Sequence, residues 1–514
     1  MSVDGSSSGN ADPLHANLAQ LLWAAASAHG DHPAVIERDR TISFSALRMY
    51  AASVAAALAA RGSTPDDRVA ILLERGADAV AALFGAYATG AIAIVVNERL
   101  RPRQVEYVLR HAAVKTLVTS AEMLSRLPRA LETDATIVDV GNARVSGAFE
   151  PMPRLATDMA QIIYTSGSTG LPKGVTFGNA SLWTGIRSVS GYLDLTADDR
   201  VAGLLPLSSV YGLNQLLCAV LCGATLVVER SPLPNQVVAS LRALGVTVVA
   251  GVPPLWLQLL SVPDFRKQAL PSLRQMQNAG GHLPTEAVRR LRQAQPHAQL
   301  ILQYGQTETF RGTYLPPEEV DRRPNSMGRA IPGVEILVLG EGATRCRPGE
   351  IGELVHRGPT IAAGYWNDPE ATAAVFRPNP LRPAGAPDGE RVVFSGDMVR
   401  TDEEGFLYFV SRRDRMIKTM GYRVGPDEIA DVLHASGEIA DAVVDAESDP
   451  ERGERIIAYV VLAPDGSLVR LERFCRAELP SYMQPSRIEQ RPHIPRLASG
   501  KYDLPTLRGR PPQP

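Results

Sequence analysis

The sequence predicts an α/β protein with a large N-terminal domain of parallel sheets covered by helices, a β-rich subdomain, and a small mobile α+β C-terminal domain. Through the first 300 residues, short runs of Val, Ile, Ala and Leu alternate with helix-length amphipathic segments. From about residue 335 onward the runs are short and Gly-rich turns separate them. The chain has 514 residues, 45% hydrophobic and 21% charged, which suits two or more globular domains.

The expected strands of the first domain are mostly continuous apolar runs, as in strands that are buried on both faces. Expected helices between them include residues 78–89 and residues 285–294, the second preceded by Pro284. The runs predict strands at residues 69–73, 92–96, 115–119, 201–206, 224–229, 246–252 and 299–304.

Beyond the first domain, residues 349–355 are typical of the short strands and Gly-rich turns of a smaller β-rich subdomain. The charge run at residues 411–415 precedes a compact α+β stretch of about 100 residues, a plausible size for a separate small domain. The predicted organisation is a disordered leader at 1–12, an N-terminal domain at 13–411, a hinge at 412–414 and a C-terminal domain at 415–514.

Composition argues against several classes of partner. The net charge of -2 gives no general electrostatic case for nucleic acid or an anionic membrane. The longest apolar run, residues 216–228, is too short to span a membrane and is interrupted by Gly223. The first dozen residues lack the basic start and apolar core of a signal peptide, and the four cysteines lack metal-ligand spacing. We therefore expect a cytoplasmic monomer or homodimer with no nucleic-acid partner and no membrane span.

Residues 164–174, Y-T-S-G-S-T-G-L-P-K-G, form a candidate phosphate-binding loop directly after the apolar run 161–163. Its backbone N–H and hydroxyl donors can surround a polyphosphate while Lys173 neutralises charge. It is not the ordinary P-loop, because Lys173 is followed by Gly174 rather than by Ser or Thr. A flexible linker is the alternative, but linkers do not usually follow a buried strand and end in Pro-Lys-Gly.

Residues 304–308, Y-G-Q-T-E, follow a predicted strand, at the end where α/β sheets present ligands. They offer an aromatic ring for a base, a hydroxyl for a phosphate oxygen and a carboxylate for Mg²⁺. Further along, Asp397 can accept hydrogen bonds from both ribose hydroxyls, and Arg412 can fix the same sugar. Each of these residues also has an alternative interpretation when taken alone. Glu308 could be an exposed loop carboxylate, and Ser-Gly-Asp at residues 395–397 could be a simple turn.

Two C-terminal segments carry further candidates. Residues 412–424, R-R-D-R-M-I-K-T-M-G-Y-R-V, would by themselves indicate a solvated charge run. Residues 495–503, P-R-L-A-S-G-K-Y-D, place a flexible Ser-Gly pair before Lys501. A mobile loop of that kind can bring a cation onto a reacting carboxylate and α-phosphate.

These five motifs, in this order, resemble those of the adenylate-forming (AMP-binding) enzyme superfamily. The chain looks closest to free-standing acyl-CoA ligases and acyl-AMP ligases, including exosortase-associated acyl-CoA ligase-like members, on the strength of residues 303–311 and 314–321. The similarity spans nearly the whole chain. It departs from the family pattern at Ser395, where Thr is usual, and at Arg415, where an acidic residue is common.

The resemblance implies a division of roles. In the family the C-terminal domain turns about a hinge between two half-reactions, so Asp414 would be the pivot, and Lys418 and Gly421 would face the site during thioester formation. Catalysis would use Lys501, Lys173, Thr307 and Glu308, with Glu308 also holding the metal. ATP or AMP would contact Thr165, Ser166, Gly167, Ser168, Thr169, Gly170, Gly280, Gly281, Tyr304, Gly305, Asp397 and Arg412.

The resemblance places the carboxylic acid between the helix after Leu207 and residues 278–282. Amino-acid-activating members carry an aspartate on that helix for the α-ammonium group, and Val210 stands there in this chain. A buried ammonium facing valine would cost several kcal/mol, so we do not expect an ordinary α-amino acid. Substrate polarity could instead be met by Gln303, His282 or Arg311. The expected pocket residues are Ser209, Val210, Tyr211, Asn278, Gly281, Gln303 and Gln306.

The sequence thus predicts an AMP-forming acid–thiol ligase. ATP-Mg²⁺ and a small carboxylic acid give acyl-AMP and pyrophosphate, and coenzyme A then gives a thioester and AMP. One alternative acceptor is the phosphopantetheine arm of a carrier protein. A nucleotide-binding pseudoenzyme is a different class, which the joint presence of Lys173, Glu308, Asp397 and Lys501 opposes. The identity of the acid and the choice of thiol stay open.

Overall fold

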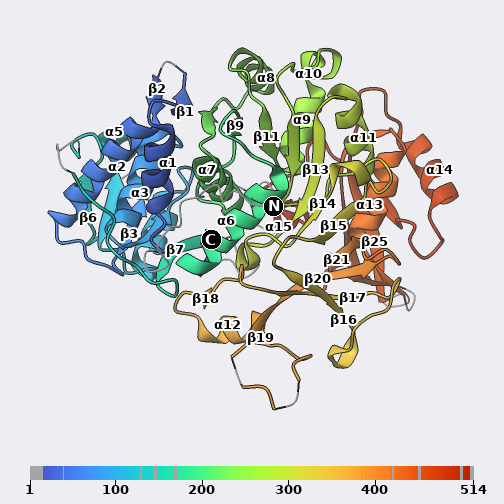
Figure 1. Ribbon diagram of the computed structural model, residues 1–514. Helices are drawn as coiled ribbons and strands as arrows, with labels where there is room; N and C mark the ends of the chain where they lie inside the picture. The colour runs from blue at the N-terminus through green and yellow to red at the C-terminus, as the bar shows by residue number, and fades with distance from the viewer. Residues whose placement is uncertain are drawn as a thin grey trace, which may run out of the picture. The chain divides into compact units, whose positions relative to one another are not determined.

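The computed structural model describes residues 16–38, 40–127, 130–143, 148–165, 172–383, 385–387, 389–413, 415–419, 422–449, 453–497 and 502–509. They form two compact units. Unit 1 comprises the described residues of Met1–Arg230, Thr307–Phe310 and Pro359–Ala373, and unit 2 those of Ser231–Gln306, Arg311–Gly358 and Ala374–Pro514. The predicted α/β class is confirmed (Figure 1).

Unit 1 contains a seven-stranded sheet in the order β18-β8-β7-β4-β3-β5-β6. The strands from β7 to β6 run parallel, whereas β8 is antiparallel to both β7 and β18. Helix α3 packs so closely on α2 that a Cβ added at Gly85 would lie 2.9 Å from Val54 Cβ. The bounds are β3 (Arg68–Ile71), β4 (Ile92–Val95), β5 (Thr116–Thr119), β6 (Thr136–Asp139), β7 (Met159–Thr165), β8 (Lys173–Gly178), β18 (Gly364–Tyr365), α2 (Phe44–Ala59), α3 (Ala77–Ala88), α4 (Pro102–His111) and α5 (Ala121–Ser125).

A second group of strands in unit 1 has the order β9-β10-β1-β2, parallel except for the β1–β2 hairpin. Helix α7 connects β9 to β10 and packs on α6. It ends at Gly223, whose φ of 70° is the left-handed conformation that glycine adopts most easily. The bounds are β1 (Pro33–Glu37), β2 (Arg40–Ser43), β9 (Arg200–Gly203), β10 (Thr225–Val228), α1 (Gln20–His29), α6 (Asn179–Leu193) and α7 (Val210–Cys222).

Unit 2 begins with the parallel strands β11, β12 and β13, continued by antiparallel β14, β15, β21, β20, β17 and β16, with β19 paired to β20. The expected change from parallel to β-rich structure is present, but it begins with β14 at Thr313, ahead of the predicted position near residue 335. The strand bounds are β11 (Val248–Gly251), β12 (Gln275–Asn278), β13 (Gln299–Tyr304), β14 (Thr313–Leu315), β15 (Ser326–Ala330), β16 (Glu335–Leu339), β17 (Gly352–Arg357), β19 (Phe376–Pro378), β20 (Arg391–Thr401) and β21 (Leu407–Arg412). The helices are α8 (Pro234–Ala243), α9 (Pro253–Ser261), α10 (Pro263–Lys267), α11 (Thr285–Ala294) and α12 (Pro369–Val375), which crosses the boundary between the units.

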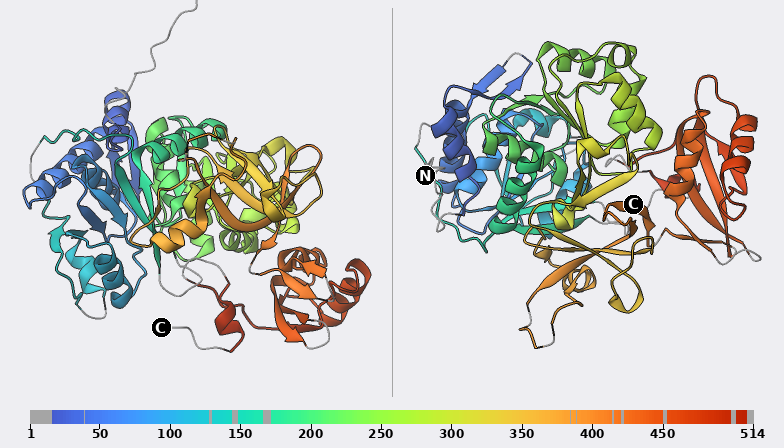
Figure 2. Two further views of the ribbon diagram at one scale, coloured as in Figure 1. Left: turned by 90° about the horizontal axis from the view of Figure 1, so that it is seen from below. Right: turned by 45° about the vertical axis from the view of Figure 1, so that its right-hand side comes forward.

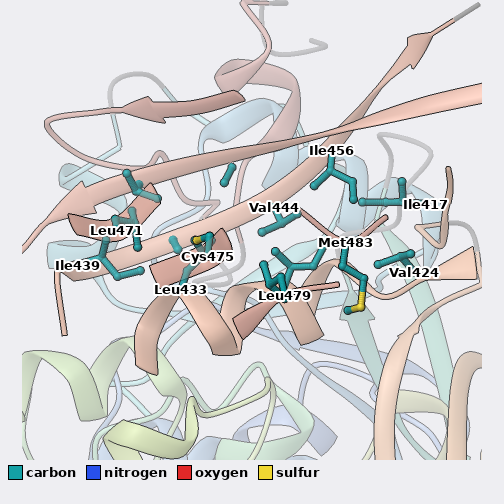
Figure 3. Close-up of a cluster of buried hydrophobic side chains, with 14 residues drawn as sticks. Ile417, Val424, Leu433, Ile439, Val444, Ile456, Leu471, Cys475, Leu479 and Met483 are labelled. Carbon is teal, nitrogen blue, oxygen red and sulfur yellow. The ribbon is translucent and has the colours of Figure 1, made fainter. Parts of the chain in front are cut away.

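The last hundred residues of unit 2 have a core of their own (Figure 3). The sheet has the order β23-β22-β25-β24, with β26 added parallel to β25, and α13 and α14 lie beside it (Figure 2). Ile417, Leu433, Val444, Ile456 and Leu471 are among the buried side chains that fill this core. The bounds are β22 (Ile417–Thr419), β23 (Tyr422–Val424), β24 (Ile439–Asp449), β25 (Gly453–Leu462), β26 (Arg487–Gln490), α13 (Pro426–Ala435), α14 (Leu468–Glu478) and α15 (Leu504–Leu507).

Each strand predicted in the parallel region is confirmed to within a few residues. Residues 299–304 coincide with β13 and residues 285–294 with α11, while α3 begins and ends one residue earlier than the predicted 78–89. The predicted hinge at 412–414 begins at Arg412, the last residue of β21, and its residue 414 lies outside the described part of the chain; the predicted domain limits stay a prediction. Within the described ranges, no helix has the length and apolarity needed to cross a membrane.

Candidate active site

The candidate phosphate loop connects two antiparallel strands, β7 and β8. Their register places Thr165 opposite Lys173. The residue after Lys173 is Gly174, and its position is too crowded for a side chain. A Cβ at this position would lie 2.9 Å from Ile162 Cγ2 and 3.3 Å from Trp366 Cβ. This crowding accounts for the glycine that sets the segment apart from an ordinary P-loop. The loop residues Ser166, Gly167, Ser168, Thr169 and Gly170 lie outside the described part of the chain.

Lys173 and Glu308 meet at one tyrosine of unit 1, Tyr365. The Lys173 ammonium lies 5.2 Å from the centroid of the Tyr365 ring, within the range of a cation–π contact. The Tyr365 hydroxyl donates a 2.6 Å hydrogen bond to Glu308 Oε1. Tyr365 is held in turn by β18, which pairs with β8 at Val175. A cation and a carboxylate, both predicted from sequence, are therefore brought together by a residue that was not.

The segment that carries Thr307 and Glu308 is a short 3₁₀ turn with a constrained end. Phe310 adopts a φ of 61°, which is uncommon for a residue with a bulky side chain. Its ring is buried, lies 6.3 Å from that of Phe177 in an edge-to-face arrangement, and covers Gly185 of α6. The Ala362 N–H also donates to the Glu308 carbonyl at 2.8 Å. The backbone beneath the Glu308 carboxylate is thus fixed from two sides.

Glu308 fits a magnesium ion that is held mainly by substrate. Among the described residues there is no group of three or more His, Cys, Asp or Glu side chains that could enclose a metal. Mg²⁺ at nucleotide sites is usually bound by one or two carboxylates together with phosphate oxygens and water. A single, half-buried carboxylate oriented by Tyr365 is compatible with that mode of binding.

In unit 2, Asp397 is the centre of a dense group of hydrogen bonds. Its side chain is 5% exposed, yet both oxygens have donors. Oδ2 accepts from the Tyr304 hydroxyl at 2.5 Å and from Gln306 Nε2 at 2.7 Å, and Oδ1 accepts from Arg412 Nη1 at 2.9 Å. Tyr304 and Arg412, both predicted nucleotide contacts, therefore converge on the predicted ribose ligand. Gln306, predicted for the acid pocket, donates to the same carboxylate.

The backbone around Asp397 explains the Ser-Gly-Asp sequence. The Ser395 hydroxyl donates to Leu354 O at 2.6 Å and accepts from the Asp397 N–H at 3.0 Å. Gly396 has a φ of 71°, a conformation that favours glycine. Serine therefore fulfils a structural role where the family has threonine. Burial, followed by the charge of Asp397, raises the pKa of Tyr304 well above its usual value, so Tyr304 stays a neutral donor.

The residues predicted for the acid pocket occur in both units. In unit 1, Ser209 is the N-cap of α7: its hydroxyl accepts from the Gly212 N–H at 3.0 Å and donates to Pro206 O at 2.8 Å. Val210 and Tyr211 begin the helix, half-buried and buried respectively. Ser209 thus has a capping role, and its place in the acid pocket stays a prediction.

In unit 2, the predicted pocket residues lie at the ends of β12 and β13. Asn278 Nδ2 donates to Gly281 O at 3.3 Å, which shapes the Gly280–Gly281 turn. Gln303 Nε2 lies 3.5 Å from Gln277 Oε1, and Gln277 Nε2 donates to Gln275 Oε1 at 2.6 Å. His282, offered as a possible substrate contact, bonds Asp431 of α13 through Nε2 at 2.8 Å.

Three residues of interest were missed from sequence. Tyr365 and Gln277 had no motif to mark them. Asn214 had a signal that could have been used, because it lies four residues after Val210 on a helix and hence on the same face. The roles predicted for Asp414, Gly421 and Lys501 lie outside the described residues, and nothing is described of the Lys418 side chain within β22.

Residues 22–366 match the profile of the AMP-binding enzyme family, and residues 428–501 that of the AMP-binding enzyme C-terminal domain. Novobiocin biosynthesis protein H of Streptomyces niveus is 31% identical over 506 residues, covering 95% of this chain and 82% of that protein. A probable non-canonical nonribosomal peptide synthetase of Salinispora arenicola is 32% identical over 96% of this chain, but this chain corresponds to only 6% of that much longer protein.

Solved structures share the fold over almost the entire chain. The o-succinylbenzoate CoA synthetase of Bacillus subtilis, in complex with its acyl-adenylate, superimposes with a TM-score of 0.80 at 27% identity, covering 94% of this chain and 96% of that one. ATP-bound MatB of Rhodopseudomonas palustris gives a TM-score of 0.86 at 25% identity, covering 96% and 98%.

Proposed function

Because this chain belongs to the AMP-binding enzyme family, we propose that it activates a small carboxylic acid with ATP and passes the acyl group to a thiol. It is an AMP-forming acid–thiol ligase. In the first step a carboxylate oxygen attacks the α-phosphorus of ATP, the bond to the β-phosphate oxygen breaks, and pyrophosphate leaves. In the second, a thiol sulfur attacks the acyl carbon of acyl-AMP, the carbon–oxygen bond breaks, AMP leaves and the thiol proton is released to solvent.

The observation that carries the proposal is the grouping of Lys173 and Glu308 around Tyr365. Charge on the transferred phosphate must be balanced in the transition state, and preorganised cations are the most effective means. Lys173 neutralises phosphate oxygens, and Glu308 holds Mg²⁺, which when bound neutralises further phosphate charge. Thr307 donates its hydroxyl to a phosphate oxygen. Lys501 supplies the cation of the adenylation step.

In unit 2, Asp397 and Arg412 hold the ribose, and Tyr304 stacks on the base. The Asp397 carboxylate already accepts three hydrogen bonds, so it is oriented before a sugar hydroxyl replaces one of its donors. The nucleotide contacts are completed by the residues of the phosphate loop and by three glycines elsewhere in the chain, Gly280, Gly281 and Gly305. Asp414 is the pivot that lets Lys418 and Gly421 reach the site for the second step.

Coenzyme A is the proposed thiol. Structural neighbours that are CoA synthetases support it. A carrier-protein phosphopantetheine is the second candidate, favoured by the similarity to the probable nonribosomal peptide synthetase of Salinispora arenicola. The two acceptors present the same thiol arm, so the residues of the site do not discriminate between them.

The test is a pyrophosphate-release assay with ATP, Mg²⁺ and a panel of carboxylic acids, followed by mass spectrometry of product with CoA or with a holo carrier protein. We expect acid-dependent pyrophosphate release and a thioester with CoA. A thioester formed only on the carrier protein would select the second acceptor. ATP binding without turnover of any acid would contradict the proposal and favour a pseudoenzyme.

A further inference from the structure

Helix α4 reaches both neighbours of Lys173 through two of its side chains. Tyr107 and His111 are four residues apart on α4 and therefore lie on the same face of the helix. Their rings stack, with centroids 5.3 Å apart and an angle of 22° between the planes. Both side chains are half-buried. The two residues thus form one aromatic pair at the C-terminal end of α4.

Tyr107 holds the residue before Lys173. The Tyr107 hydroxyl donates a 3.2 Å hydrogen bond to the Pro172 carbonyl oxygen. This oxygen belongs to the same planar peptide unit as the Lys173 N–H, so a bond that fixes the oxygen also fixes the backbone at the start of Lys173. A side chain of α4 therefore restrains the chain where it enters Lys173.

His111 holds the residue after Lys173 by way of Tyr164. A 2.8 Å hydrogen bond joins His111 Nδ1 and the Tyr164 hydroxyl, and the two rings meet edge to face with centroids 5.8 Å apart. Tyr164 is paired with Gly174 in the register of β7 and β8, and a Cβ added at Gly174 would lie 3.2 Å from Tyr164 Cζ. The Tyr164 ring thus lies against the backbone of Gly174, and His111 fixes the hydroxyl end of that ring.

The same end of α4 also contacts the segment that carries the ring beneath the Lys173 ammonium. Asn367 Nδ2 donates a 3.3 Å hydrogen bond to the His111 carbonyl oxygen. Asn367 lies two residues after Tyr365, whose ring centroid is 5.2 Å from the ammonium. The backbone on both sides of Lys173 and the segment that contacts its charge are therefore anchored to one helix end.

We propose that Tyr107 and His111 are positioning residues that hold Lys173 in register with the triphosphate of ATP. This inference rests on the proposed function, in which Lys173 neutralises phosphate oxygens. Tyr107 and His111 act through the neighbours of Lys173 and do not themselves touch the nucleotide. A lysine carries its charge at the end of a flexible four-carbon side chain, so a displaced backbone moves the ammonium relative to the phosphates.

The test compares the binding of MgATP and of AMP by isothermal titration calorimetry. ATP carries two phosphates that AMP lacks, so a displaced Lys173 should weaken ATP binding selectively. Tyr107→Phe and His111→Phe each keep the stacked rings and remove one hydrogen bond. We expect each variant to raise the Kd for MgATP about fivefold, the size of effect expected for one lost hydrogen bond, and to leave the Kd for AMP within about twofold.

Two double-mutant comparisons show whether these effects pass through the proposed contacts. In a Lys173→Met background the ammonium is absent, so adding Tyr107→Phe should change the ratio of the two Kd values by less than about twofold. Tyr164→Phe removes the same hydrogen bond as His111→Phe from the other side. The two should give equal effects singly and no further loss together, and Tyr164→Phe takes the place of His111→Phe if that variant does not fold.

Thr119→Val is the matched control. The buried Thr119 hydroxyl donates a 2.8 Å hydrogen bond to the Leu72 carbonyl oxygen in the same seven-stranded sheet. Its loss should lower the melting temperature and leave both Kd values within about twofold of the wild type, because this bond does not hold a neighbour of Lys173.

Three results would overturn the inference: an equal weakening of ATP and AMP binding by Tyr107→Phe and His111→Phe, unchanged binding of both ligands as in Thr119→Val, or a fivefold effect of Tyr107→Phe that persists in the Lys173→Met background. In each case ATP still binds and the ligase function stands. A wild-type protein that binds no MgATP would instead reject the proposed function itself.

Discussion

Tyr365 shows how one side chain can organise two charged groups. Its ring lies beneath the Lys173 ammonium, and its hydroxyl donates a hydrogen bond to the Glu308 carboxylate. The apolar and the polar part of this side chain therefore contact different partners. It is 57 residues from Glu308 in sequence and lies on a two-residue strand. The pairing of β18 with β8 brings it to the site.

Tyr365→Phe separates these two contributions. The variant keeps the ring beneath Lys173 and loses the hydrogen bond to Glu308. We expect kcat/KM for MgATP to fall about tenfold, equivalent to about 1.4 kcal/mol, near the lower limit for a hydrogen bond to a charged group. The Mg²⁺ concentration for half-maximal rate should rise, because the carboxylate is less well oriented.

Tyr408→Phe is the matched control. Its hydroxyl also donates to a carboxylate, Asp402, at 2.9 Å, but neither residue is among the predicted site residues. Pyrophosphate-release kinetics of this variant should match the wild type within about twofold. If the two variants behaved alike, Tyr365 would have no special part in positioning Glu308.

The residues that sequence could identify were those in contiguous motifs. Lys173, Glu308 and Asp397 belong to short strings whose residue types indicate nucleotide chemistry, and a resemblance supplied their roles. Tyr365 could not be found in this way, because its partners come from strands and turns far away in the chain. Ser209 was predicted as a pocket residue, but a serine directly before an apolar helix also predicts an N-cap, and Ser209 is the N-cap of α7.

At the scale of elements, helix α6 positions the 3₁₀ turn that contains Thr307 and Glu308. The contact depends on the absence of a side chain at Gly185, where the Phe310 ring occupies the space. Phe310 is held at a positive φ by this packing, which transmits any displacement of the ring to the turn.

Gly185→Ala should therefore impair both stability and activity. The added methyl group would lie 2.4 Å from Phe310 Cδ1, and overpacking of this kind costs roughly 1–3 kcal/mol. Displacement of Phe310 should also lower the rate of pyrophosphate release. Urea unfolding and steady-state kinetics measure the two effects.

Gly191→Ala on the same helix is the control, because a Cβ at this position meets nothing within 4 Å. Alanine is a better helix former than glycine, so we expect a gain of up to about 1 kcal/mol and unchanged kinetics. An equal destabilisation by both substitutions would show that helix α6, rather than the contact with Phe310, is sensitive.

Helix α13 presents a second element-scale contact, between Asp431 and His282. Burial opposes protonation of His282, but the hydrogen bond and charge of Asp431, with the charge of Asp427, raise its pKa above the usual value. A histidine whose pKa is raised by folding stabilises the protein fully below the unfolded value of about 6.5, and this stabilisation is lost as pH rises through the folded value.

The difference in melting temperature between the wild type and His282→Gln tests this. It should be largest at about pH 6 and should shrink toward about pH 9. Burial also raises the pKa of Asp427 and lowers that of His434, but both groups are present in both proteins. A difference that does not vary with pH would mean that His282 does not bind Asp431 as an imidazolium.

For the whole molecule, hydrophobic patterning was sufficient to predict the class and most elements. Continuous apolar runs marked β3, β4 and β11, since strands that are covered on both faces cannot alternate in polarity. The acid pocket was less accessible to prediction. The residues predicted for it lie on α7 in unit 1 and on β12 and β13 in unit 2, and the environment of Asn214 or Gln303 depends on packing that no local pattern encodes.

The central claim is that the carboxylate attacks the α-phosphorus of ATP. It is tested most directly by transferring oxygen label from an acid with an ¹⁸O-labelled carboxylate, using the best acid of the panel, ATP, Mg²⁺ and CoA. The account predicts that one labelled oxygen appears in AMP, detected by mass spectrometry, while pyrophosphate stays unlabelled. Label in inorganic phosphate, with ADP as the nucleotide product, would show attack on the γ-phosphorus and contradict it.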